Sequence, residues 1–140
     1  KPQEMADFLN KESGVLGITG ISSDMRDIEN ADNEGNKLAH LALQMYAYRI
    51  KKYIGAYAAA MNGVDIIVWT AGVGETGLRW DVCQDMEYLG IKLDKKRNEV
   101  RGEEQILSTD DSKVKVVLVP TDEEIVIARD TQELVKDLKK

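Results

Sequence analysis

The sequence is poor in the features that mark secreted proteins, membrane proteins and cysteine-based metal proteins. Cys83 is the only cysteine among 140 residues, which excludes an internal disulfide framework and a metal site built from several cysteines. No apolar run approaches the roughly 18 residues of a membrane-spanning helix, and the first residues show no basic and apolar leader. We therefore expect a cytoplasmic protein that makes no membrane contact.

Basic residues are also in the minority. Nineteen Lys and Arg against 25 Asp and Glu give a net charge of −6. This balance argues against nucleic-acid binding, because that function needs a basic face. Apolar residues make up 43% and charged residues 31% of the chain, which is the composition of a soluble folded domain. A chain of 140 residues is long enough for one domain with its own core.

Apolar spacing predicts helices in the first half of the chain. A short helix begins at Pro2, since proline is favoured in a first turn, and it stops at Gly14. Residues 13–23 form a glycine-punctuated connection for which neither helix nor strand is favoured, and residues 30–36 form a polar turn. The strongest pattern predicts a helix over residues 36–61. Its apolar residues recur at intervals of three and four and are expected on one stripe: Leu43, Tyr46, Ala47, Ile50, Tyr53, Ile54, Tyr57, Ala58 and Met61.

Two continuous apolar runs predict strands in the second half. Residues 64–71 and 113–119 are rich in β-branched residues, which is typical of strands buried on both faces. The first run is followed by a helix that carries Val82 and ends at Gly90, and the second by a helix after Pro120. This order of strand, helix, strand and helix predicts an α/β domain with parallel strands.

A glycine-rich turn, GVGETG, follows the first strand at residues 72–77. Its spacing matches the G-x-G-x-x-G of dinucleotide-binding loops, and Asp94 stands about 20 positions further on, where such proteins carry an acidic residue. Glu75 argues against that interpretation, since a carboxylate repels a pyrophosphate. The large Trp80 argues against it as well. Alternatively, the glycines only make a tight turn between strand and helix.

A second turn, PTDEE at residues 120–124, follows the second strand. Thr121 and Glu124 have the spacing of a capping box, in which Thr121 is the N-cap of the final helix. Acidic residues in a first turn are also favoured by the helix dipole. Carboxylates at the carboxyl end of a strand are equally suited to anchor Mg²⁺, directly or through water. Both interpretations stay open at this point.

A third polar segment, SSDMRD, places Arg26 between Asp24 and Asp27. Such an arginine can clamp a phosphate or a ribose, or it can form surface ion pairs that stabilise the fold little. His40 has no Cys, Asp or Glu at ligand spacing and is expected to have a structural role. Cys83 has no activating neighbour in the sequence and is expected to pack in the core.

In this order, the three segments resemble the C-terminal part of the acetate and propionate kinases. The resemblance covers essentially the whole chain and rests on three stretches: SGVLGITGISSDMRDIE, YRIKKYIGAYAAAMNGVDIIVWTAGVGE and VLVPTDEEIVIARDT. It implies the α/β, ribonuclease H-like fold of the superfamily that contains acetate and sugar kinases, heat-shock chaperones and actin. Residues 1–140 would then be a C-terminal nucleotide-binding domain without its N-terminal domain. The start at Lys1, with no initiator Met, fits either a piece of a longer protein or a processed one.

The resemblance also assigns roles residue by residue. Glu123 matches the family's Mg²⁺-associated glutamate. The nucleotide-contacting segment and the adenosine loop are matched by Asp24, Met25 and Arg26, and by Gly72, Val73, Gly74, Glu75 and Thr76. Because this loop faces adenosine rather than a pyrophosphate in the family, Glu75 causes no conflict there. The chain departs from the family's pattern at Thr76, where Asn is common, and at Met25, where an aromatic residue is common.

The implied activity is transfer of the γ-phosphoryl group of ATP to acetate, which gives acetyl phosphate and ADP with Mg²⁺ as cofactor. The family's catalytic groups and acetate pocket lie in the N-terminal portion, so no catalytic residue is assigned here and the chain alone is expected to be inactive. Propionate is the alternative substrate.

The resemblance further implies a homodimer formed through this part of the protein, for which the stripe from Tyr46 to Met61 is a candidate interface. Two functions of other classes stay open. The glycine spacing allows an NAD-binding oxidoreductase domain, and the stripe allows a module that serves assembly.

Overall fold

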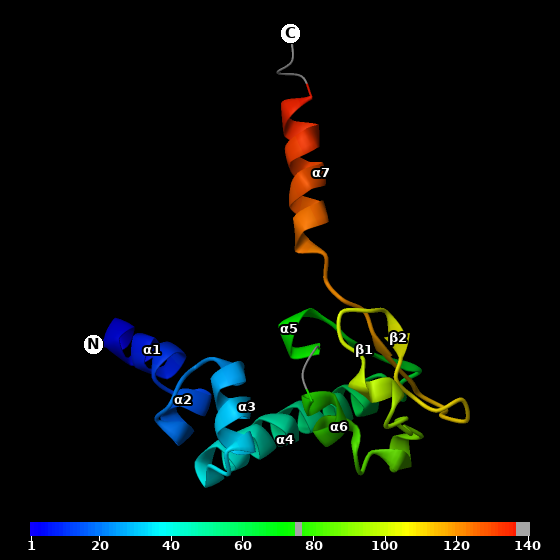
Figure 1. Cartoon of the computed structure of the whole chain (residues 1–140), viewed down its shortest axis with the longest axis horizontal. Helices are drawn as coiled ribbons and strands as arrows, with labels where there is room; N and C mark the ends of the chain where they lie inside the picture. Colours follow the sequence, from blue (N-terminus) through cyan, green and yellow to red (C-terminus); the bar gives the residue numbers. More distant parts are fainter. Residues whose placement is uncertain (75–76, 137–140) are drawn as a thin grey trace.

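A computed structural model describes residues 1–74 and 77–136 (Figure 1). Glu75 and Thr76, two residues of the expected adenosine loop, lie outside the described residues. The helices are α1 (Pro2–Lys11), α2 (Gly14–Thr19), α3 (Met25–Asn33), α4 (Lys37–Ala60), α5 (Ala71–Gly74), α6 (Leu78–Cys83) and α7 (Glu123–Val135), with short 3₁₀ turns η1 (Glu87–Leu89) and η2 (Arg97–Glu99). The strands are β1 (Ile66–Trp69), β2 (Gln105–Ile106) and β3 (Lys115–Leu118).

Two helices lie within the first 19 residues, and the second falls in the stretch for which the sequence favoured neither helix nor strand. Helix α1 confirms the helix expected from Pro2, and α2 lies within the glycine-rich connection. Gly20 ends α2 in the left-handed conformation, with φ +66°, which glycine adopts at little cost. Gly20 therefore ends the helix, whereas Gly14 and Gly17 lie within it.

Helix α3 occupies most of the segment expected to be a polar turn, so that expectation is wrong for Asn30 to Asn33. The helix forms because Asp24 caps it, accepting a hydrogen bond from Arg26 N. It is held by Ile28, which is fully buried against Ala39 and Ala42 of α4. The true turn is limited to the residues around Gly35.

The long helix α4 confirms the prediction for residues 36–61. Asn36 is its N-cap, and the side-chain oxygen accepts hydrogen bonds from Leu38 N at 2.9 Å and Ala39 N at 3.1 Å. The expectation of one shared stripe is wrong in part. Ala47 and Ala58 are buried, whereas Tyr53, Tyr57 and Met61 are exposed.

The sheet has the order β1-β3-β2. β1 and β3 are parallel, as predicted, whereas the antiparallel β2 was not expected from the sequence. One face of the sheet packs in the main core through Trp69, Val116 and Leu118. The same core includes residues from α4, from α6 and from the segments that follow α6: Ala47, Leu78, Val82, Cys83, Met86, Ile91, Leu107 and Val114.

The other face of the sheet is open in the described chain. Ile66, Val68 and Ile106 are 57%, 54% and 50% exposed. Val68 and Ile106 both pair with Val117, so these side chains form one apolar row across the three strands. The expectation that both strands are covered on both faces is therefore wrong for the described residues.

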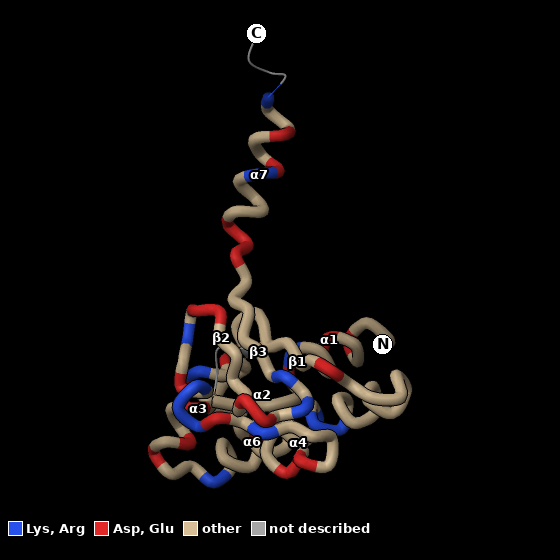
Figure 2. Tube along the Cα trace, turned by 90° about the vertical axis from the view of Figure 1, so that its right-hand side faces the viewer, with Lys and Arg blue, Asp and Glu red and all other residues tan. Residues whose placement is uncertain are grey.

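The two helices after the strands differ from expectation in different ways. The one predicted to run to Gly90 ends at Cys83, and Asp85 has a left-handed φ of +60° before η1 begins. Helix α7 forms as predicted but projects away from the rest of the chain (Figures 1 and 2). None of its residues is buried, and Ile125, Val126 and Ile127 are exposed.

Gly90 provides a test of the packing between η1 and the strand β3. Its φ is +87°, and a Cβ at this position would lie 2.9 Å from Lys113 Cβ. Gly35 has the same φ of +87° and nothing within 4 Å of a built Cβ. Alanine at either site costs about 1–2 kcal/mol for the left-handed backbone. We predict a larger loss of unfolding free energy for Gly90→Ala than for Gly35→Ala in urea titrations, and equal losses would contradict the close approach.

Candidate functional site

The candidate site lies where β1 and β3 end. The two strands are parallel, so their carboxyl ends meet at the same edge of the sheet, which is where α/β proteins commonly bind ligands. The glycine-rich residues of α5 follow β1, and the PTDEE turn follows β3. Two segments about 50 positions apart in sequence are thereby brought together, as the sequence order of strands and helices predicts.

Direct hydrogen bonds join these two segments. Ala71 N donates to Thr121 Oγ1 at 2.8 Å, and the hydroxyls of Thr70 and Thr121 are 3.2 Å apart. The backbone contributes one further bond, from Val119 N to Trp69 O at 2.9 Å. The start of α5 is therefore held against the turn that leads into α7.

Thr121 is not the N-cap of α7, so the expected capping box with Glu124 is wrong. The N-cap is Asp122, and its Oδ1 accepts a hydrogen bond from Ile125 N at 2.9 Å. The Thr121 hydroxyl is instead used to bind Ala71 N. Sequence alone favours Thr121 because capping boxes are recognised from spacing, whereas the competing acceptor role depends on a residue 50 positions away.

Glu123 is the first residue of α7 and is exposed. In residues 1–74 and 77–136, no group of three or more His, Cys, Asp or Glu side chains is arranged to hold a metal ion. A cation bound at Glu123 would therefore need ligands beyond the side chains of the described residues. This arrangement fits Mg²⁺, which is usually held by one or two carboxylates together with substrate phosphates.

The third predicted segment lies at the start of α3. The Arg26 guanidinium donates three hydrogen bonds to the Asp24 carboxylate: Nε to Oδ1 at 3.0 Å, Nε to Oδ2 at 3.2 Å and Nη2 to Oδ2 at 2.6 Å. The hydrogen bonds from Arg26 lower the pKa of the Asp24 carboxyl to about 2. The Arg26 side chain is 85% exposed, so the geometry is that of a surface ion pair. Met25 is half-buried and packs against the main core.

A cavity of about 250 Å³ connects α3 with the exit of the glycine-rich loop, and sequence reasoning missed it. Its lining includes Asp32 of α3, Gly77 at the end of the loop and Asp81 of α6. Burial raises the pKa of Asp81, and the nearby negative charge of Asp32 acts in the same direction. The sequence does not predict this cavity, because its lining comes from three separate helices at positions with no common spacing.

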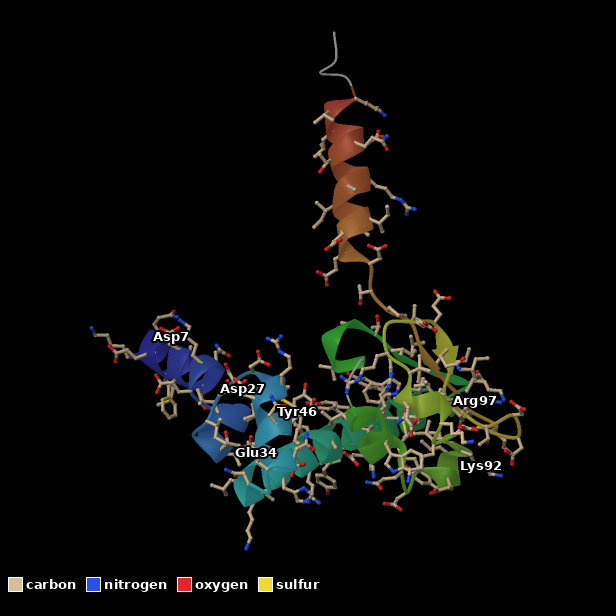
Figure 3. The ribbon with its side chains drawn as sticks, viewed as in Figure 1. Asp7, Asp27, Glu34, Tyr46, Lys92 and Arg97 are labelled. Carbon is tan, nitrogen blue, oxygen red and sulfur yellow. The ribbon has the colours of Figure 1, made fainter. Side chains whose placement is uncertain are left out.

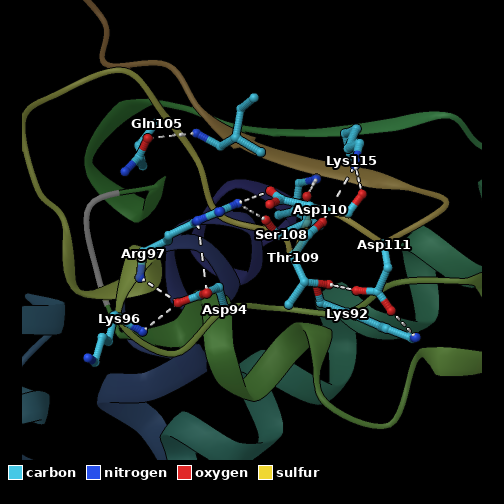
Figure 4. Close-up of polar contacts among 12 residues, drawn as sticks. Lys92, Asp94, Lys96, Arg97, Gln105, Ser108, Thr109, Asp110, Asp111 and Lys115 are labelled. Carbon is cyan, nitrogen blue, oxygen red and sulfur yellow. Dashed lines mark hydrogen bonds and ion pairs between the residues drawn. The ribbon is translucent and has the colours of Figure 1, made fainter.

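Asp94 has a structural role in its own turn. Its Oδ1 accepts hydrogen bonds from Lys96 N at 2.9 Å and Arg97 N at 3.0 Å, so the carboxylate caps a local turn (Figure 4). Arg97 also donates to Ser108 O at 2.8 Å and to Asp110 Oδ1 at 2.9 Å. The carboxylate that would complete a dinucleotide-binding loop is thus used within the fold.

The remaining candidate residues have structural environments. His40 Nδ1 lies 3.1 Å from Asp32 Oδ1, a contact between neighbouring helices. Cys83 is buried in the main core, and this burial raises the pKa of its thiol to about 11. The expectation that Cys83 packs in the core is confirmed.

Comparison with solved structures identifies the class of protein. The chain superimposes on the crystal structure of Porphyromonas gingivalis acetate kinase with a TM-score of 0.87 and 54% identity, covering 96% of this chain and 35% of that one. It superimposes on a propionate kinase from Francisella tularensis with a TM-score of 0.79 and 30% identity, covering 92% of this chain and 33% of that one. The fold is that of the acetate and sugar kinases, as the sequence resemblance implied.

The chain belongs to the acetokinase family, whose model matches residues 1–129. It is 61% identical over 140 residues to the acetate kinase of Thermoanaerobacter pseudethanolicus, covering 98% of this chain and 35% of that protein. It is also 61% identical over 142 aligned positions to the acetate kinase of Thermotoga maritima, with the same coverage of each, 98% and 35%. The chain therefore spans about 35% of the length of these relatives. None of its described helices is long and apolar enough to cross a membrane.

The ion pair at the start of α3 gives a test of the site's electrostatics. Its contribution to stability is present above the ordinary aspartate range and is lost as the pH falls toward about 2, because the folded-state pKa of Asp24 is depressed. We predict that Arg26→Gln raises the pKa of Asp24 toward its ordinary value, measured by NMR titration of the carboxyl carbons. Asp110, whose pKa is lowered by Arg97, serves as the unaffected control. An Asp24 pKa that stays at about 2 would contradict the assignment to Arg26.

Proposed function

We propose that residues 1–140 are the C-terminal nucleotide-binding domain of a longer acetate kinase. In the complete enzyme, the γ-phosphoryl group of ATP is transferred to acetate, giving acetyl phosphate and ADP. The single observation that carries this proposal is 61% identity to two acetate kinases along nearly the whole chain. We propose acetate rather than propionate as the substrate, because the chain is 61% identical to the two acetate kinases and only 30% identical to the propionate kinase. A cytoplasmic location stays a prediction.

The adenosine side of the nucleotide is assigned to the loop that follows β1, formed by Gly72, Val73, Gly74, Glu75 and Thr76. Support comes from its place at the carboxyl end of a parallel strand, where backbone N–H groups and glycines let a ligand approach closely. Asp24, Met25 and Arg26 form the second nucleotide-contacting segment. Arg26 must exchange its bond to Asp24 for one to the nucleotide if its guanidinium contacts phosphate or ribose.

Glu123 is the residue assigned to Mg²⁺. Glu123 is exposed at the start of α7, and its carboxylate would hold the cation together with nucleotide phosphates, directly or through water. When bound, Mg²⁺ offsets negative charge on the phosphoryl group in transfer. The chain's own part is to present one carboxylate at the start of α7, next to the turn that contacts α5.

An NAD-binding domain is the competing function, and one observation weighs against it. The acidic residue at the required distance, Asp94, already accepts two backbone hydrogen bonds in its own turn. Its carboxylate therefore already has a role within the local fold. The glycines in this loop are then explained by a tight turn and a close approach of the backbone to a ligand, which an adenosine loop also requires.

The preceding part of the longer enzyme is proposed to cover the surfaces that are open here. The apolar row across the sheet exposes large apolar side chains, and so does helix α7, whose side chains project from an isolated helix (Figure 3). Exposed patches of this kind mark interfaces. The catalytic groups and the acetate pocket are assigned to that preceding part, so the isolated chain would not turn over substrate.

A homodimer through this domain is also proposed, with the outer face of α4 as the interface. Tyr53 and Tyr57 of this helix are exposed one turn apart, and so is Met61 at its C-cap. The rings of Tyr53 and Tyr57 stack with centroids 6.3 Å apart, which orders the face without a partner. Aromatic and methionine side chains are enriched at protein interfaces.

The function is tested in the complete kinase by comparing Glu123→Gln with Glu124→Gln. These neighbouring substitutions remove the same charge, but only Glu123 is assigned to the metal. We predict that Glu123→Gln raises the Mg²⁺ concentration for half-maximal acetyl phosphate formation by about 10- to 100-fold, while Glu124→Gln changes it little. Equal effects would refute the metal assignment. A wild-type enzyme that binds NADH but neither ADP nor ATP would refute the kinase assignment.

The dimer is tested by sedimentation velocity. Tyr57→Glu places a charge on the exposed face of α4 and is predicted to shift the protein toward monomer. Tyr88→Glu is the matched control, because Tyr88 is 73% exposed but lies outside that helix. A wild-type protein that remains a strict monomer at high concentration would contradict the proposed interface.

A further inference from the structure

Where β1 and β3 end, the hydrogen bonds between the two segments change from backbone acceptors to a side-chain acceptor. Their backbone pairing continues to the bond from Val119 N to Trp69 O, at 2.9 Å. At the next donor along the first strand, Ala71 N, the acceptor is a side-chain oxygen, Thr121 Oγ1, at 2.8 Å. The Thr121 hydroxyl thus extends the pairing between the two segments by one step beyond the sheet.

The residue held by this bond has an unusual backbone conformation. Ala71 has a left-handed φ of +56° although it is not glycine. For a residue with a Cβ, this conformation costs roughly 1–2 kcal/mol and needs surrounding contacts to maintain it. Ala71 is also the first residue of α5, so its conformation sets the direction in which the glycine-rich loop leaves the sheet.

Thr121 is well placed to couple the two loops. It lies after β3 and directly before Asp122, the N-cap of α7. Its hydroxyl is 3.2 Å from that of Thr70, so the oxygen can accept from Ala71 N while the hydroxyl proton is directed to Thr70 Oγ1. One hydroxyl therefore touches both residues at the β1 end, two positions before Glu123.

We propose that Thr121 is a positioning residue for nucleotide binding. Its hydroxyl holds Ala71 in the left-handed conformation, and this fixes α5, which carries the proposed adenosine contacts, relative to the turn that carries Glu123. The inference rests on the proposed function. Thr121 acts through Ala71 and is not itself assigned a contact with the nucleotide.

The test uses the complete kinase and compares Thr121→Val with Thr121→Ser. Valine keeps the shape of threonine and removes the hydroxyl, whereas serine keeps the hydroxyl. We expect Thr121→Val to raise the KM for ATP about three- to tenfold, the range for loss of one hydrogen bond. The KM for acetate should stay at the wild-type value, kcat should fall less than the KM for ATP rises, and Thr121→Ser should restore the wild-type KM. Thr70→Val is the control, because Thr70 contacts Thr121 but not Ala71 N.

A second substitution tests the route through Ala71. Glycine adopts a positive φ at little cost, so Ala71→Gly lessens the need for the hydroxyl. We expect the double variant Thr121→Val with Ala71→Gly to recover most of the lost ATP affinity. A double variant that binds ATP no better than Thr121→Val overturns the inference, because the hydroxyl then does not act through the Ala71 backbone.

The remaining outcomes also decide the matter. An unchanged KM for ATP in Thr121→Val overturns the inference. If Thr121→Val does not fold, Thr121→Ala replaces it under the same criterion, and misfolding of both assigns the hydroxyl to overall stability and overturns the inference. Wild-type enzyme without ATP-dependent acetyl phosphate formation refutes the proposed function instead, which separates the two failures.

Discussion

The parallel pairing of β1 with β3 is the constraint on which the candidate site depends. Four consecutive residue pairs, from Ile66 with Lys115 to Trp69 with Leu118, fix the register of the two strands. A slip by one residue would turn Val116 and Leu118 out of the core and expose them. Just beyond these pairs, Ala71 N donates to Thr121 Oγ1 at 2.8 Å, so the packing of the core and the geometry of the loops are fixed together.

Sequence predicts the parts of this fold that depend on local periodicity. The helix predicted over residues 36–61 matches α4 within one residue at each end, because Asn36 caps the helix. The strand predicted over residues 113–119 contains the shorter β3, because β-branched residues mark it. Helix α3 was missed because its polar residues carry almost no apolar pattern, and it is held by the single buried side chain of Ile28. The two-residue strand β2 was missed because it exists only through its pairing with β3.

In the candidate site, too, local features are predictable from the sequence and contacts with distant residues are not. The loops themselves are recognisable because glycines after a strand and acids before a helix have characteristic spacing. What each side chain does there is decided by distant partners, and a single sequence does not encode those as a pattern. Thr121 has the spacing of an N-cap but binds Ala71 N, while the cap is supplied by Asp122. Asp94 has the spacing of a ribose ligand but caps a turn.

The buried thiol of Cys83 has a practical consequence. A thiol with a pKa of about 11 is almost entirely protonated at neutral pH, and it is enclosed by the main core. Only the thiolate reacts readily with alkylating reagents. Because the sequence contains no second cysteine, modification of this one atom would report directly on opening of the core. The rate of alkylation therefore measures how often the core around Cys83 opens.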